Sequence, residues 1–164
     1  MNSKKIFIWG FLFVSVIGSL LHFVYEWSGN NSIVRLFAPW NESTWEHMKL
    51  LFFPMLVLML FLFFKLPEQS PIPVALSIGT LVGLALIPIL FYTYTGVLGF
   101  SVMAIDIAIF YISVLGVFLT GWFLKDNREL ANRSGLLLTC LVILAILFFI
   151  FSYDPPEIGL FQEP

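Results

Sequence analysis

Residues 134–151 read SGLLLTCLVILAILFFIF, a run of eighteen residues without a charged side chain. An α-helix needs about 20 mostly apolar residues to cross the hydrocarbon core of a bilayer. Four more runs of similar length and composition precede this one, so the sequence predicts an all-α integral membrane bundle of five transmembrane helices. The expected spans, all within one domain of residues 1–164, are 6–25, 43–64, 74–94, 100–124 and 134–151.

The composition also indicates a protein whose solvent is the bilayer. Of the 164 residues, 60% are hydrophobic and 11% are charged, whereas a soluble domain is about 45–50% apolar and about 25% charged. This composition excludes a water-soluble enzyme, a nucleic-acid-binding protein and a disordered chain. The net charge of −2 gives no reason to expect a polyanionic partner. The single cysteine, Cys140, cannot form an intramolecular disulfide.

The first span also resembles a secretory signal peptide, because Lys4 and Lys5 precede an apolar run. That run is too long for a signal peptide, and no small-residue cleavage site follows it, so we expect a retained helix. A retained first helix is needed for the count of five spans and for the orientation that follows from it.

The basic residues predict the orientation of the bundle. Five spans place the two termini on opposite sides of the membrane, and basic residues concentrate on the cytoplasmic side. Six of the eight lie on the amino-terminal side, which predicts a cytoplasmic amino terminus and a carboxy terminus outside the cell. These six are Lys4, Lys5, Lys65, Lys125, Arg128 and Arg133, and the two on the other side are Arg35 and Lys49.

Small residues in the third span predict close helix packing. Gly79 and Gly83 form a G-x-x-x-G pair, extended by Ala75 one turn earlier, and this spacing lets a neighbouring backbone approach closely. Glycine is also common in membrane helices in general, so the pair alone does not establish a contact. Pro54 and Pro88 are expected to bend the second and third spans.

Polar residues follow one stripe of the first span. Successive helical residues turn by about 100°, which aligns Ser15, Gly18, Ser19, His22 and Glu26. Because lipid offers no hydrogen-bond partner, this stripe should face the bundle interior or a hydrated cavity. His22 and Glu26 are four residues apart, so their side chains can meet at the outer end of the helix. The alternative is an interfacial pair that only anchors the helix end.

The second span opens with residues 39–49, PWNESTWEHMK. Asn41 is a good helix N-cap, and Ser43 with Glu46 forms an alternative capping box. Within a helix, Glu42 and Glu46 would be four residues apart and would repel each other, which predicts a shared counter-charge. Candidates for it are Lys49, Arg35, a protonated histidine, a proton and a metal ion. The alternative is a charged cap at the level of the lipid headgroups.

Asp106 lies inside the fourth span, roughly 9 Å from the expected start at Phe100. A charge at that depth costs roughly 2–3 kcal/mol on insertion scales, which makes Asp106 the strongest single candidate for function. Its alternative role is a structural partner for a basic group. We therefore predict a polar, ionisable pocket that opens to the outside. Its expected residues are His22, Glu26, Asn41, Glu42, Trp45, Glu46, His47, Lys49 and Asp106.

The pocket residues allow more than one kind of chemistry. The candidates for catalysis are His22, Glu26 and Asp106, because a His–Glu pair in proximity can serve as acid and base. A divalent metal is a candidate cofactor, since nitrogen and oxygen ligands suit zinc or manganese, although no paired-His spacing is present. The candidate metal ligands are His22, Glu26, Glu46, His47 and Asp106.

Three segments carry a resemblance to a known family. HFVYEWSG at residues 22–29 and FAPWNESTWEHMK at 37–49 resemble an uncharacterised family of small bacterial multi-pass membrane proteins, domain of unknown function 6512 (DUF6512). PPEIGLFQEP at residues 155–164 is similar to that family's ending. The resemblance implies a bacterial inner-membrane protein and brings no activity with it.

A weaker similarity is to the sterol-isomerase-like membrane fold. There a His and a Glu four residues apart in one helix face a lipid pocket, and His22 and Glu26 stand at the matching spacing. That fold usually has four core helices, and no second carboxylate stands in a matching context here. The similarity implies a lipid-like ligand.

These features predict a small protein of the bacterial plasma membrane that binds or moves a small molecule, an ion or a lipid at its outer face. The alternatives are an intramembrane enzyme that acts on a lipid-like substrate through a His–Glu pair or a metal, and an accessory subunit. Membrane lipid and a small-molecule or lipid ligand are the expected partners, and nucleic acid is not. The sequence leaves open whether the chain forms a homo-oligomer or binds a partner membrane protein. It also leaves open the conformation of residues 27–40, which a short amphipathic lid on the membrane would fit.

Overall fold

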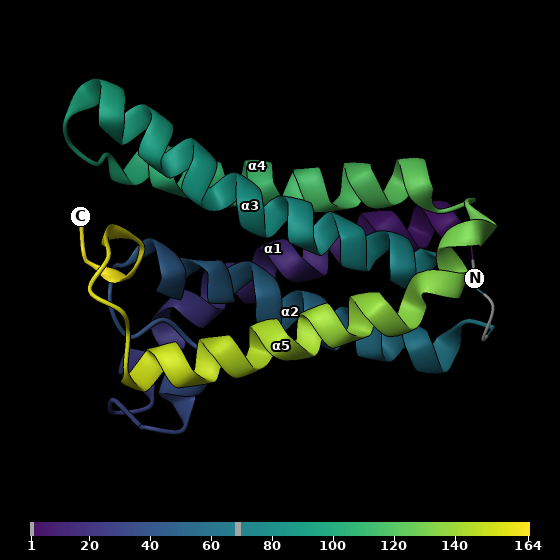
Figure 1. Ribbon diagram of the computed structural model, residues 1–164, viewed down its shortest axis with the longest axis horizontal. Coiled ribbons are helices and arrows are strands. Elements are labelled where there is room, and N and C mark those ends of the chain that lie inside the picture. The colour runs from purple at the N-terminus through teal and green to yellow at the C-terminus, as the bar shows by residue number, and fades with distance from the viewer. Residues whose placement is uncertain (1, 68–69) are drawn as a thin grey trace.

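Five long α-helices make up most of the described chain (Figure 1). The structure is a computed structural model that describes residues 2–67 and 70–164, without the side chains of residues 131–133. The helices are α1 (Ser3–Trp27), α2 (Thr44–Lys65), α3 (Ile72–Leu98), α4 (Met103–Leu124) and α5 (Ser134–Tyr153), with short 3₁₀-helices η1 (Val34–Leu36), η2 (Arg128–Arg133) and η3 (Gly159–Phe161). No strand occurs within these described residues. All five α-helices are long and apolar enough to cross a membrane, which confirms the predicted all-α fold of a multi-pass membrane protein.

The helix ends follow local sequence signals. Asn2 caps α1 by accepting a hydrogen bond from the Lys4 backbone N–H at 2.9 Å. Of the two caps predicted for α2, Ser43 is the one used, since its hydroxyl accepts from the Glu46 N–H at 3.3 Å. Asn41 lies outside the helix, and its side-chain oxygen accepts from the Ser43 N–H at 3.1 Å. The second helix therefore begins at Thr44, after Glu42.

Helix α2 is the central element of the bundle. It contacts α1, α3, α5 and η3, and more than half of its most apolar stretch is buried. Helix α3 packs most extensively on α4. Helix α5 is the least buried of the five, and its buried residues are Leu141, Phe148 and Ser152. This difference means that a few specific contacts hold α5 to the rest of the chain.

The two glycines of the G-x-x-x-G pair bring α3 and α4 together. A Cβ atom added at Gly79 would lie 2.3 Å from the Val117 carbonyl oxygen. At Gly83 it would lie 2.5 Å from the Val117 side chain and 3.0 Å from the Ser113 carbonyl oxygen. Neither glycine position leaves room for an alanine side chain, so the predicted close approach of a neighbouring backbone is confirmed. Gly18 plays the same part between α1 and α2, where its Cβ would lie 2.5 Å from the Leu50 carbonyl oxygen.

One end of the bundle collects both histidines and most of the acidic residues. We call it the His22 end: it is formed by the last turns of α1, α3 and α5 and the first turns of α2 and α4. The connection between α1 and α2 turns back at Gly29 and Asn30, both with positive φ, and continues through η1. The tail after α5 also folds over this end, and η3 contacts α2. In Figure 1 the N-terminus lies at the opposite end of the bundle from the C-terminus.

Candidate functional site

The predicted pocket residues fall into three groups at the His22 end rather than into one cavity. The first group lines a cavity and includes the His47 side chain beside it. The second is a buried ion pair with its aromatic neighbour, and the third is Asp106 with a tyrosine partner. In order, the groups contain His22, Glu26, Asn41, Glu42 and His47; then Trp45, Glu46 and Lys49; and then Asp106.

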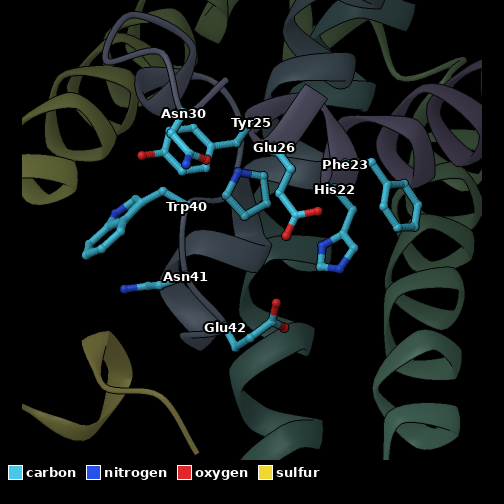
Figure 2. A pocket seen from close by; sticks show the side chains of 9 residues that line it. His22, Phe23, Tyr25, Glu26, Asn30, Trp40, Asn41 and Glu42 are labelled. Atoms are coloured by element: carbon cyan, nitrogen blue, oxygen red, sulfur yellow. The ribbon is translucent and has the colours of Figure 1, made fainter. Parts of the chain in front are cut away.

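The cavity lies between the last turns of α1 and the connection that leads into α2. Its volume is about 340 Å³. Figure 2 shows the carboxylates of Glu26 and Glu42 and the ring of His22 directed toward a common space. The lining residues from α1 are His22, Phe23, Tyr25 and Glu26, and those from the connection are Asn30, Pro39, Trp40, Asn41 and Glu42. A large share of this wall is therefore polar, and it carries two acidic groups.

The helical spacing of His22 and Glu26 places both side chains on this cavity. Glu26 is exposed and His22 is half-buried. Within the described part of the chain, no hydrogen bond or ion pair joins the two side chains. The His22 Nδ1 atom is buried and has no hydrogen-bond partner among the described residues. His22 therefore presents an unsatisfied polar atom next to a cavity that contains two carboxylates.

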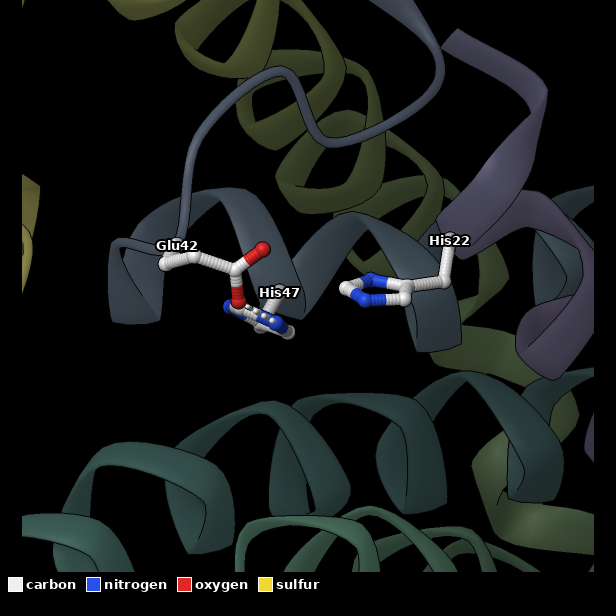
Figure 3. Close-up of side chains that lie close together, drawn as sticks. All are labelled: His22, Glu42 and His47. Atoms are coloured by element: carbon white, nitrogen blue, oxygen red, sulfur yellow. Dashed lines mark ion pairs between the residues drawn. The ribbon is translucent and has the colours of Figure 1, made fainter. Parts of the chain in front are cut away.

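His47 and Glu42 form an ion pair beside His22. The His47 Nε2 atom lies 3.3 Å from a Glu42 carboxylate oxygen, and the rings of His22 and His47 are 5.4 Å apart between centroids. Figure 3 shows Glu42 beside the His47 ring and His22 approaching from α1. One ligand atom from each of the three residues lies within 4.8 Å of the other two.

The backbone fixes the orientation of the His47 ring. Its Nδ1 atom lies 3.0 Å from the Ser43 carbonyl oxygen. Because a carbonyl oxygen only accepts, Nδ1 carries the hydrogen of this bond. In a neutral ring, Nε2 would then direct a lone pair at the Glu42 carboxylate, which is also an acceptor. A proton or a bound cation must therefore lie between these two groups.

The hydrogen bond from His47 also affects the acidity of Glu42, which precedes α2. This bond holds the pKa of the Glu42 carboxyl below its ordinary value. Partial burial acts in the opposite direction, and the nearby His47 and His22 rings add to the lowering. Glu42 is thus held as a carboxylate, the form that accepts hydrogen bonds or binds a cation.

Lys49 and Glu46 form the second group, in the interior between α2, α5 and the connection. The Lys49 ammonium donates to a Glu46 carboxylate oxygen at 2.7 Å and to the Arg35 carbonyl oxygen at 2.9 Å. It also donates to the Ser152 hydroxyl of α5. Lys49 and Glu46 are 0% and 2% exposed. Trp45 packs beside them against Phe148, with ring centroids 4.6 Å apart.

Glu42 and Glu46 do not share one counter-charge, so that expectation was wrong, and each carboxylate has a partner of its own. Glu42 pairs with His47, and Glu46 pairs with Lys49. The physical reason is the position of the helix start: because α2 begins at Thr44, Glu42 lies in the connection and is not one helical turn from Glu46. The two carboxylates can therefore point to different partners.

Asp106 forms the third group, on α4. It accepts a hydrogen bond from the Tyr94 hydroxyl, which in turn accepts from the Val102 N–H at 3.1 Å. Because α4 begins at Met103, three residues after the expected start, Asp106 stands in the first turn of the helix. An acidic residue in a first turn is favoured by the helix dipole. Its depth along α4 is therefore about 4.5 Å rather than the expected 9 Å.

The comparison with family models covers the whole chain. A model described as a family of unknown function, DUF6512, matches residues 1–164. The chain belongs to the DUF6512 family. This confirms the resemblance seen in the motifs at residues 22–29, 37–49 and 155–164. No curated protein and no solved structure matches this DUF6512 protein.

Several residues of the DUF6512 protein that shape the site were not predicted. Tyr25 and Asn30 line the cavity, and Trp40 is covered on one side by the Arg35 guanidinium at 3.7 Å from its ring centroid. The positions of Asn30 and Trp40 depend on the fold of residues 28–43, which has no periodic pattern, whereas Tyr25 lies in α1 three residues after His22. Ser152 did leave a signal, because it is a polar residue close to the end of an otherwise apolar helix.

Proposed function

We propose that this multi-pass membrane protein binds a small cationic ligand or an ion in the cavity at its His22 end. The observation that carries the proposal is the composition of the cavity wall. Two carboxylates, from Glu26 and Glu42, face a space of about 340 Å³, and none of the nine lining residues is Lys or Arg. The charged side chains of the wall are therefore acidic, and because Glu42 is already paired with His47, it is Glu26 that supplies the negative charge that attracts cations.

The surroundings of the cavity strengthen this electrostatic preference. The charge of a carboxylate acts over a longer range beside a low-dielectric helix bundle than in bulk water. Aromatic side chains of Phe23 and Tyr25 add π-faces, which also attract cations, whereas one face of Trp40 is already covered by the Arg35 guanidinium. The nearest described lysine of the interior, Lys49, is neutralised by Glu46 and does not line the cavity.

The charge distribution along the sequence supports an opening on the outer side of a bacterial plasma membrane. Six of eight basic residues lie in the first turn of α1, at the end of α2 or between α4 and α5, at the other end of the bundle. By the positive-inside rule, that end is cytoplasmic. The ligand would then enter from the extracytoplasmic side.

Thiol labelling with reagents of opposite charge tests this proposal. A cysteine replaces Tyr25 in a Cys140→Ser background, and its reaction rates with a cationic and an anionic methanethiosulfonate are compared. Val97→Cys is the matched control, because Val97 stands at the same end and is 81% exposed. We expect the cationic reagent to be preferred more strongly at Tyr25→Cys than at Val97→Cys.

The carboxylates provide the second half of the test. Adding Glu26→Gln and Glu42→Gln to the Tyr25→Cys protein should reduce the charge preference to the level of the control. An unreactive Tyr25→Cys, or a preference equal to that of Val97→Cys from the start, would show that the cavity does not select cations. Either result overturns the proposal.

A further inference from the structure

We infer that His22, Glu42 and His47 bind a divalent transition-metal ion, with Zn²⁺ the best match to the ligand set. The inference deepens the proposed function by naming the cation. Two imidazole nitrogens and one carboxylate oxygen are a ligand set found at catalytic zinc sites, where three protein ligands leave one position open. Ca²⁺ and Mg²⁺ prefer oxygen ligands and would bind this set poorly.

The distances already approach those of a coordination shell. Ligands about 2.0–2.1 Å from a tetrahedral zinc ion lie about 3.3 Å from one another. His47 Nε2 and the Glu42 carboxylate oxygen are 3.3 Å apart, and all three ligand atoms lie within 4.8 Å of one another. A movement of His22 toward the pair by at most about 1.5 Å would complete the three-ligand geometry.

His47 is oriented as metal-binding histidines are. Such residues donate the N–H of one ring nitrogen to a carbonyl or carboxylate, which leaves the other nitrogen free for the metal. His47 Nδ1 makes this bond to the Ser43 carbonyl at 3.0 Å, and its Nε2 faces Glu42. The carbonyl belongs to the N-cap residue of α2, so the helix start itself holds the ring in place.

His22 supplies the independent observation. Its Nδ1 atom is buried without a hydrogen-bond partner among the described residues, an arrangement that is costly unless a partner is bound. Its ring lies 5.4 Å from that of His47 between centroids. Because His22 and Glu42 both line the cavity, the open position of the ion would face it, and water or an anionic group could occupy that position.

Metal titration of the full chain in detergent tests the inference. The protein is purified without a polyhistidine tag, in a Cys140→Ser background, and is freed of metal with a chelator. Zn²⁺ binding is measured by calorimetry, and Co²⁺ is used as a spectroscopic probe. We expect one Zn²⁺ per chain and the visible absorption of tetrahedral Co²⁺, with no comparable binding of Ca²⁺.

Single substitutions assign the ligands. His22→Gln, Glu42→Gln and His47→Gln should each weaken Zn²⁺ binding more than about 10-fold, since loss of even an outer-shell partner costs about 10–100-fold. Glu157→Gln is the control, because it removes an exposed carboxylate of the tail that does not line the cavity. His22→Cys should retain binding and add a thiolate-to-Co²⁺ charge-transfer band, which a folding defect could not produce.

The results separate this inference from the proposed function. Absence of stoichiometric Zn²⁺ binding, or binding that survives all three glutamine substitutions, shows that Glu42 and His47 are only a protonated ion pair and overturns the metal site. The labelling experiment uses metal-free protein, so a retained charge preference leaves the cavity proposal standing in that case. Conversely, loss of the charge preference with Zn²⁺ still bound removes the cavity proposal alone.

Discussion

Lys49 of α2 and Ser152 of α5 are 103 residues apart in sequence, and a hydrogen bond joins the ammonium of one to the hydroxyl of the other. Both side chains are 0% exposed. The same ammonium binds the Glu46 carboxylate and the Arg35 carbonyl oxygen. One buried lysine thus ties α5, the connection between α1 and α2, and the first turns of α2 together. The Tyr153 hydroxyl, which donates to the Ser32 carbonyl oxygen at 2.6 Å, is a second link between the otherwise little-buried α5 and that connection.

Breaking the Lys49–Glu46 pair from one side should be more damaging than removing both groups. Glu46→Met or Lys49→Met alone leaves a buried charge without its partner, which typically costs about 3–5 kcal/mol. The double substitution removes both charges and should lose less stability than either single one. Thermal unfolding of the three variants in detergent, followed by circular dichroism, measures this. Additive losses would mean that the two residues do not act as a pair.

Adding one methyl group at Gly79 should loosen the packing of α3 on α4. The Cβ of Gly79→Ala would lie 2.3 Å from the Val117 carbonyl oxygen, and overpacking of this kind costs about 1–3 kcal/mol. Gly96→Ala is the matched control in the same helix, because nothing lies within 4 Å of its added Cβ. We expect a lower unfolding temperature for Gly79→Ala and no decrease for Gly96→Ala. Equal behaviour of the two variants would contradict the close approach.

The tail should contribute to stability through Phe161. This side chain is 9% exposed and packs against Trp45 and Phe151, with ring centroids 4.9 and 5.1 Å away. Phe161→Ala should destabilise the protein by about 3 kcal/mol or more and make the tail more sensitive to protease. Ile158→Ala, at a position that is 56% exposed, should change neither property. A protease-resistant tail in Phe161→Ala would show that other contacts hold it.

The orientation is tested from outside the cell. Cysteines replace Ser3 and Glu163, one at a time, in the Cys140→Ser background, and intact cells are treated with a membrane-impermeant thiol reagent. Because six of eight basic residues lie on the amino-terminal side, the positive-inside rule predicts labelling of Glu163→Cys and none of Ser3→Cys. Labelling at Ser3→Cys would reverse the orientation and place the His22 end in the cytoplasm.

Much of the fold could be predicted from the chain alone. The apolar runs are long, and breakers such as Gly99 and the prolines near residue 70 separate them, so the number and type of helices follow from local composition. The predicted spans agree with the helices within a few residues, except that α3 extends four residues beyond residue 94. The period of the α-helix also placed His22 and Glu26 on the same side of α1, where both line the cavity.

The partners of the polar residues could not be predicted in the same way. The separation of Glu42 from Glu46 depends on a helix start that differs by a few residues among equally good caps, Asn41 and Ser43. The approach of His22 to His47 joins two helices through a connection without periodic structure. Neither the helix start nor the approach of His22 to His47 follows from the spacing of residues within one segment.

The sequence by itself determined five apolar helices, the end of the bundle at which both histidines and most acidic residues gather, and membership of the chain in its family. These properties depend on side-chain polarity and on local helix signals, which are present in every short window of the chain. The tertiary structure alone decided the contacts between separate segments, such as Lys49 with Ser152 and with the Arg35 carbonyl oxygen, and His22 with His47. Such contacts form where packing brings separate segments together, and a fully buried group such as Lys49 needs these partners because no water reaches it.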